Sequence, residues 1–252
     1  MNTSVKLKGL KKFNLIIGFI HLIQAILMVW LSTGFTIKIT SSYMMGPPGT
    51  TIMGTEVLFD ISLGLYVALF MFLSSIAHLI VSTFAYQWYI KNLKNHINRA
   101  RWIEYSLSSS LMIIIIAMLV GITDLGVLIS LFIVNASMIF FGWMMELYNQ
   151  KTEKVVWTPF VFGCIAGLAP WITIFIRLIT AINISSVGVP TFVIWIFVSL
   201  FVFYNTFAVN QFLQYKKVGV WKDYLYGEKV YILLSLVAKS VLAWQVFSGT
   251  LM

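Results

Sequence analysis

One lysine occupies a position where a charged side chain is unexpected, in the middle of the last long apolar run of the chain. Lys239 lies in the segment SLVAKSVLAW at residues 235–244. If this run is a helix, about nine residues, or about 13 Å, separate Lys239 from either end. A lysine in such surroundings tends to lose its proton, and a neutral amine can attack a carbonyl carbon. Lys239 therefore either binds an aldehyde cofactor as a Schiff base or forms a buried ion pair that holds two helices together.

A positive nitrogen in apolar surroundings needs a negative partner, because desolvation otherwise removes its proton. The sequence has eight acidic residues. Three lie between apolar runs, Glu153, Asp223 and Glu228, and three lie near the ends of runs, Glu56, Asp60 and Asp124. Glu104 and Glu146 remain as candidate partners. Glu104 lies in the segment RWIEYSLSSS at residues 101–110. One helical face there carries Arg101, Glu104, Tyr105, Ser108 and Met112. This face suits the wall of a pocket with a polar end.

Glu104 has a second interpretation, as an interfacial carboxylate paired with Arg101. The apolar run begins only at Trp102. For Glu104 to reach Lys239, its helix must therefore begin several residues earlier, near His96.

The composition as a whole is typical of a membrane protein. The 252 residues are 60% hydrophobic and 10% charged, whereas soluble domains carry about 25% charged residues. This composition excludes a soluble enzyme and a disordered or fibrous chain. The single Cys164 lies in an apolar run, which leaves no disulfide framework and no cysteine metal site.

Seven apolar runs are long enough to cross a bilayer as helices. They cover residues 13–35, 57–86, 102–122, 125–148, 157–182, 189–213 and 230–249. The first run is too long for the apolar part of a signal peptide, and no small-residue cleavage site follows it. We expect an all-α membrane protein, with residues 1–252 forming a single seven-transmembrane-helix domain.

The basic residues predict the orientation of this bundle. Most of them precede the first run or lie in every second loop after it: Lys6, Lys8, Lys11, Lys12, Lys91, Lys94, Arg99, Arg101, Lys151, Lys154, Lys216, Lys217, Lys222 and Lys229. The positive-inside rule places these segments and the N-terminus in the cytoplasm, and the C-terminus outside. The net charge of +9 therefore indicates topology, and no loop is long enough to fold a nucleic-acid-binding module.

One sizeable loop lies outside, at residues 36–56. The alternating segment TIKIT at residues 36–40 predicts a strand, and GPPGTT at residues 46–51 predicts a turn. We expect a small β-hairpin in this first extracellular loop.

With this topology, the polar groups inside the runs gather in the cytoplasmic half. They are His21, His78, Asn98, Arg101, Glu104, Glu146 and Ser235. The outer half is apolar apart from Arg177, and one polar half-channel cannot by itself carry ions across a membrane. The two histidines match no metal-site spacing and are more simply interpreted as core residues with satisfied hydrogen bonds.

A long polyene would need smooth apolar walls beside Lys239. Met138, Ile139, Gly142, Pro170, Trp171 and Tyr204 could supply them. Gly142 gives room, and Pro170 bends its helix. The alternative is that these side chains serve only as packing or interface anchors.

The chain resembles a microbial-type rhodopsin, because it has seven apolar runs, a lysine within the seventh run and an acidic residue in the third. Its inverted orientation resembles the heliorhodopsin family. The segments that carry the resemblance are RWIEYSLSSS at 101–110, VNASM at 134–138, FFGW at 140–143, FGCIAG at 162–167, SLVAKS at 235–240 and GPPGTT at 46–51. The likeness covers nearly the whole chain.

The resemblance implies all-trans retinal on Lys239 as a Schiff base, Glu104 as its counterion, and a cytoplasmic polar network that includes His21, His78, Glu146 and Ser235. It also implies a homodimer in the lipid bilayer of the cell membrane that senses light without obvious ion pumping and signals to an unidentified partner. A light-driven ion transporter on the same scaffold is the alternative. A membrane enzyme would need a nucleophile elbow, a phosphate loop or metal spacing, and the sequence has none of them.

Overall fold

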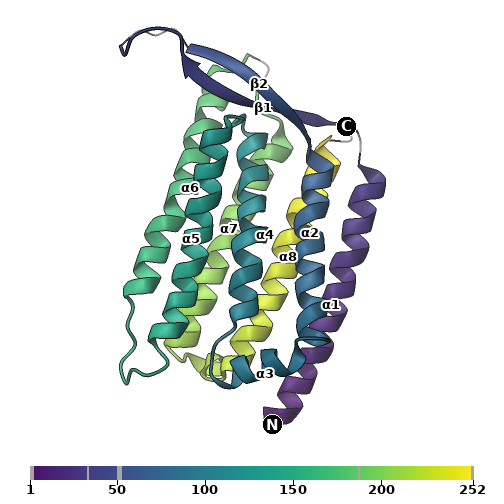
Figure 1. The fold of residues 1–252 in the computed structure, drawn as a ribbon, viewed down its shortest axis with the longest axis vertical. Helices are drawn as coiled ribbons and strands as arrows, with labels where there is room; N and C mark the ends of the chain where they lie inside the picture. The colour runs from purple at the N-terminus through teal and green to yellow at the C-terminus, as the bar shows by residue number, and fades with distance from the viewer. Residues whose placement is uncertain (1–2, 33, 50–52, 187, 251–252) are drawn as a thin grey trace.

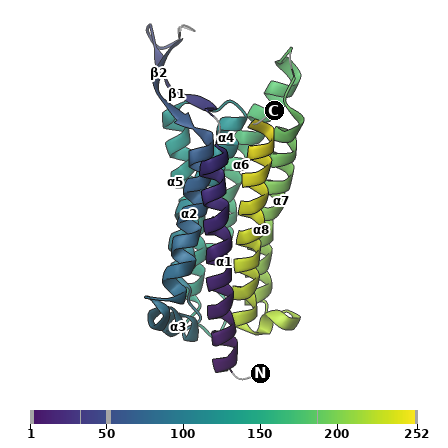
Figure 2. The ribbon, with the colours of Figure 1, turned by 90° about the vertical axis from the view of Figure 1, so that its right-hand side faces the viewer.

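The computed structural model describes residues 3–32, 34–49, 53–186 and 188–250. The helices are α1 Thr3–Leu31, α2 Leu63–Ser82, α3 Tyr86–Lys94, α4 Arg99–Leu119, α5 Leu125–Tyr148, α6 Thr158–Ile184, α7 Thr191–Tyr215 and α8 Tyr224–Thr250, with a 3-10 turn, η1, at Gly219–Lys222. The strands are β1 Thr36–Met44 and β2 Met53–Ser62. The long helices form an upright bundle with the β-hairpin across one end (Figure 1). The chain begins at the opposite end and finishes beside the hairpin (Figures 1 and 2).

Seven helices among the described residues are long and apolar enough to cross a membrane, and α3 is the short exception. Each is at least 20 residues long and mostly apolar, as a bilayer crossing requires. α4 lies in the middle of the bundle (Figure 1), and 67% of its most apolar segment is buried, the largest share of the seven. The expected seven-helix membrane fold with a small hairpin is confirmed.

The boundaries differ most from the expected ones at α1, α2 and α8. α1 begins at Thr3 instead of residue 13 and ends at Leu31 instead of residue 35. Residues 57–62, expected in the second span, extend β2, because they continue the pairing of that strand with β1. α8 begins at Tyr224 rather than near residue 230. Its earlier start adds a full turn and places Glu228 within a transmembrane helix instead of a loop.

The hairpin is antiparallel, with Thr36 opposite Ser62 and Met44 opposite Met53. It is attached to the turn between α4 and α5. The amide of Thr40 donates to the carbonyl of Thr123 at 2.9 Å, and the amide of Ser42 donates to a carboxylate oxygen of Asp124 at 2.8 Å. Of the predicted turn at residues 46–51, Thr50 and Thr51 lie outside the described residues.

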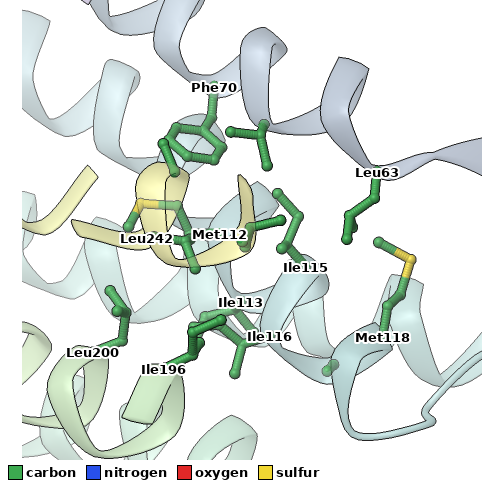
Figure 3. Packing of buried hydrophobic residues seen from close by; sticks show 14 of the residues in the cluster. Leu63, Phe70, Met112, Ile113, Ile115, Ile116, Met118, Ile196, Leu200 and Leu242 are labelled. Carbon is green, nitrogen blue, oxygen red and sulfur yellow. The ribbon is translucent and has the colours of Figure 1, made fainter. Parts of the chain in front are cut away.

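Two apolar clusters fill the bundle. The larger one occupies the half next to the hairpin, where buried side chains of α2, α4, α7 and α8 meet (Figure 3). The smaller one lies near the start of the chain and includes Leu7, Leu10, Tyr89 and Leu93. Buried charged residues lie in the region between these clusters, and this region is the candidate site.

Candidate functional site

Lys239 of α8 and Glu104 of α4 form a buried ion pair at the centre of the bundle. Nζ of Lys239 lies 2.7 Å from Oε1 of Glu104, and the two side chains are only 3% and 7% exposed. Nζ also donates to the hydroxyl of Ser235, one turn earlier on α8, at 2.9 Å. The hydroxyl of Ser74 on α2 donates to the same Glu104 oxygen at 2.6 Å. Three helices therefore fix the position of this pair.

Glu104 reaches this depth although α4 begins at Arg99 and not near His96. Asn98 caps the helix, because its side-chain oxygen accepts the amide proton of Arg101 at 3.1 Å. Arg101 and Trp102 are already buried. The first turn of α4 thus lies inside the protein, and the apolar composition of the run underestimates how deeply its start is placed.

A cavity lies beside Lys239, between α4, α5, α6, α7 and α8, with an empty volume of about 830 Å³ including its open side. The expected wall residues that line it are Tyr105, Ser108, Met112, Met138, Ile139, Gly142, Tyr204 and Ser235. Pro170 and Trp171 are buried but are not among its lining residues. Trp171 instead packs edge-on against Tyr204, with ring centroids 5.3 Å apart, and so supports the wall from behind.

Sequence reasoning missed about half of the lining. The further lining residues are Trp102, Ser109, Pro159, Phe160, Gly163, Cys164, Phe207, Ala208, Gln211, Tyr231 and Ala238. Gly163 and Cys164 fall in the segment FGCIAG, so that motif pointed to this part of the wall. The others lie on α4, α6, α7 and α8, and their place in the wall depends on the rotation of these helices about their axes, which composition does not reveal.

The cavity suits an elongated apolar aldehyde such as retinal. Its walls are mainly aromatic and aliphatic, and a single amine, Nζ of Lys239, lies among its lining groups. Two glycines leave room for neighbouring side chains at and behind the wall of the cavity. A Cβ added at Gly142 would lie 2.5 Å from the Trp102 ring, and one at Gly167 would lie 2.6 Å from the sulfur of Met138. The residues present therefore fit such a group.

A second buried charge cluster lies between the pair and the end of the bundle where the chain begins. The guanidinium of Arg101 binds Glu146 on α5 at 2.6 Å and Glu228 on α8. Asn98 donates to Glu228 through its side chain at 2.6 Å and to Glu146 through its backbone amide at 2.9 Å. Trp102 donates its indole proton to Glu146 at 2.6 Å. Each carboxylate is thus paired with the guanidinium of Arg101 and hydrogen-bonded, as buried charges require.

Glu228 was missed because the hydropathy of the sequence placed the start of the last span at residue 230, after Glu228. A signal for it exists once the helix is extended. Tyr224, Glu228, Tyr231, Ser235 and Lys239 are spaced by three or four residues and share one face of α8. That face carries the polar groups of the site over the whole distance from the helix start to Lys239.

His21 and His78 are stacked, with ring centroids 5.7 Å apart. Nδ1 of His78 lies 2.8 Å from the side-chain oxygen of Asn14, and Nδ1 of His21 lies 3.3 Å from the sulfur of Met71. A small cavity is lined by His78 of this pair, by Glu104 of the ion pair and by Arg101 and Glu228 of the second cluster, among others. Within the described part of the chain, no group of three His, Cys, Asp or Glu side chains could hold a metal ion.

Comparison with known families identifies the scaffold. The model of the heliorhodopsin family matches residues 10–251, nearly the whole chain. The chain belongs to the heliorhodopsin family. Heliorhodopsins are seven-helix membrane rhodopsins, so membership implies a retinal chromophore and a bilayer environment for this heliorhodopsin. The family is one of photoreceptor rhodopsins and not a classical enzyme class. No curated protein matches the chain.

Proposed function

We propose that this heliorhodopsin is a light sensor that carries all-trans retinal on Nζ of Lys239 as a Schiff base. The observation that carries the proposal is the buried amine of Lys239, 2.7 Å from Glu104 and at the wall of an apolar cavity. Retinal, when bound, supplies absorption of visible light and a light-driven change of shape. The wall residues Met138, Ile139, Gly142 and Tyr204 would hold its apolar chain. Pro170 and Trp171 would shape the pocket only through the side chains that they support.

Glu104 is the proposed counterion. Its carboxylate supplies the negative charge that keeps a positive nitrogen at Lys239 stable without water. Ser74 and Ser235 hold the two partners through hydrogen bonds, so the charges cannot separate without breaking these contacts. A change at Lys239 is therefore transmitted at once to α2, α4 and α8.

Polar groups near Lys239 could accept a proton that its Nζ releases after illumination. Ser235, the His21–His78 pair and the small cavity near Arg101 all lie beside the ion pair or between it and the start of α8. Nε2 of His21 is buried and has no hydrogen-bond partner among the described residues, so it retains the capacity to bind a proton or water. We propose that Glu146 and Glu228, held by Arg101, form the far end of this region.

We further propose that the N-terminus lies in the cytoplasm and the C-terminus outside the cell membrane. Lysines concentrate at the bundle end where α1 begins, as the positive-inside rule requires of the cytoplasmic side. The hairpin would then lie outside. In this orientation the polar region opens toward the cytoplasm, which suits a signal to an internal partner.

The distribution of charges favours sensing over transport. Among the described residues, the buried side chains of Asp, Glu, Lys, Arg and His are His21, His78, Arg101, Glu104, Glu146, Glu228 and Lys239. The half next to the hairpin is filled by the larger apolar cluster instead. A transporter needs an ionisable path on both sides of the lysine, and we propose that the buried charged groups of the described residues supply one on a single side.

Illumination of retinal-loaded protein in sealed vesicles tests this conclusion. We expect a transient change in the visible spectrum without a lasting pH change in the medium. A sustained light-driven pH change that a protonophore abolishes would establish proton transport and contradict the proposed function.

The proposal includes a single domain of residues 1–252, a homodimer in the bilayer and no enzymatic activity. Exposed apolar side chains on the hairpin, among them Tyr43, Met44 and Phe59, offer area for self-association outside the spans. Native mass spectrometry from nanodiscs should release a dimer. A monomer at all protein concentrations would contradict this part of the proposal.

A further inference from the structure

A basic groove lies far from the retinal site, between the first turns of α1 and the start of α8. Its empty volume is about 900 Å³, including its open side. Figure 2 shows α1 and α8 side by side. Its lining includes Lys6, Lys12, Phe13, Asp223 and Lys229. Neither the buried ion pair nor the Arg101 cluster contributes to it.

The groove has an excess of positive charge. Three lysines, Lys6, Lys12 and Lys229, line it, and Asp223 is the one acidic lining residue. Asp223 is already paired with Lys6, at 2.7 Å. The ammonium groups of Lys12 and Lys229 therefore remain without a carboxylate among the lining residues. Such a site attracts an anion.

Its depth matches the headgroup region of a bilayer. Lys12 directly precedes the apolar sequence that starts at Phe13, and Lys229 directly precedes the one that starts at Val230. Both ammonium groups thus lie where a membrane changes from headgroups to hydrocarbon. Nζ of Lys229 lies 5.6 Å from the centre of the Phe13 ring, so charge and apolar surface adjoin within one groove.

We propose that this groove binds the phosphate of an anionic phospholipid. Lys12 and Lys229 neutralise the phosphate, and Phe13 and Ile16 contact the first methylenes of an acyl chain. Ile16 lines the groove and is 46% exposed. A lipid gains from covering this surface, whereas a free phosphate ion gains nothing from it. The bound lipid connects α1 to α8, the helix that carries Lys239.

Lipid retention measured by native mass spectrometry tests the proposal. The purified full chain receives equal amounts of dioleoylphosphatidylglycerol and dioleoylphosphatidylcholine, and we expect it to retain the anionic lipid preferentially. Lys12→Gln and Lys229→Gln should each lower this preference about fivefold. The matched control is Lys151→Gln, which removes the same charge from the loop between α5 and α6 and should leave the preference unchanged.

Asp223→Asn gives a test of opposite sign. It keeps the size of the side chain and frees Lys6, so the preference for the anionic lipid should increase. Equal retention of both lipids, or equal effects of Lys12→Gln and Lys151→Gln, would overturn the proposal. Inorganic phosphate should not displace the lipid. Displacement by millimolar phosphate would assign the groove to free anions and overturn the lipid assignment.

Discussion

Nζ of Lys239 and Oε1 of Glu104 lie 2.7 Å apart, although 135 positions separate the two residues in the sequence. The two interpretations of Lys239 that the sequence leaves open are therefore compatible. An ion pair joins α4 to α8, and the same pair lies at the wall of a cavity that suits retinal. A buried charge without its partner is costly, so both residues are constrained even before a chromophore binds.

Glu104→Gln should shift the visible band to the red, because the negative charge beside Lys239 is lost. The same loss destabilises a positive nitrogen, so the visible form should disappear at a lower pH than in the unmodified protein. A spectrophotometric pH titration measures both effects. Glu146→Gln is the matched control, since Glu146 binds Arg101 instead of Lys239. Equal titrations of the unmodified protein and Glu104→Gln would remove Glu104 from the counterion role.

Much of the fold was predictable, because hydropathy and loop charge are local properties of a membrane chain. The seven spans follow from the length of the apolar runs, and the bounds of α5 match the expected residues 125–148. Residues 57–62 were placed in a helix because they are apolar, and only their pairing with β1 shows them to be a strand.

The site was predictable only in part. Lys239 and Glu104 are noticeable because charges are rare inside spans. Glu228 is not noticeable, since it lies close to lysines at a span end, and its burial depends on Arg101, 127 positions away. The direction in which Trp171 points depends on the rotation of α6, which the sequence alone does not determine.

Arg101→Gln should destabilise the protein more than Glu228→Gln. Without Arg101, Glu146 and Glu228 remain as two buried carboxylates with no cation between them. Without the charge of Glu228, Arg101 and Glu146 still form a neutral pair. Breaking a buried pair costs about 3–5 kcal/mol, and we expect Arg101→Gln to reach this range and Glu228→Gln to fall below it. Thermal unfolding in nanodiscs measures the order, and a reversed order would contradict the assigned charges.

Gly142→Ala should destabilise the wall of the cavity. The added Cβ would lie 2.5 Å from the ring of Trp102, whose indole donates to Glu146 at 2.6 Å. Trp102 must shift, and overpacking of this kind costs about 1–3 kcal/mol. Gly9→Ala is the control, because a Cβ there meets no atom within 4 Å and alanine favours the helix by about 1 kcal/mol. An unfolding temperature of Gly142→Ala at or above that of the unmodified protein would show that the wall is not tightly packed.

The attachment of the hairpin should weaken in acid. The amides of Ser42 and Val127 hold the pKa of Asp124 below its ordinary value. Because the folded-state pKa is depressed, this attachment is fully present above the ordinary pKa of aspartate and is lost as the pH falls through the folded value. Hydrogen exchange should then show less protection of the Ser42 amide. The Thr40 amide is an internal control, since it donates to a backbone carbonyl that cannot titrate. Equal loss of protection at both amides would indicate general unfolding instead.

The most direct test of the central claim is a visible absorption spectrum after all-trans retinal is added to the purified protein and to Lys239→Ala. The unmodified protein should develop a visible band that free retinal lacks, and Lys239→Ala should not. Lys229→Ala, a lysine on the same helix outside the cavity, should develop the band normally. A visible band that persists in Lys239→Ala, or one that never forms in the unmodified protein, would contradict the assignment of Lys239 as the residue that binds retinal.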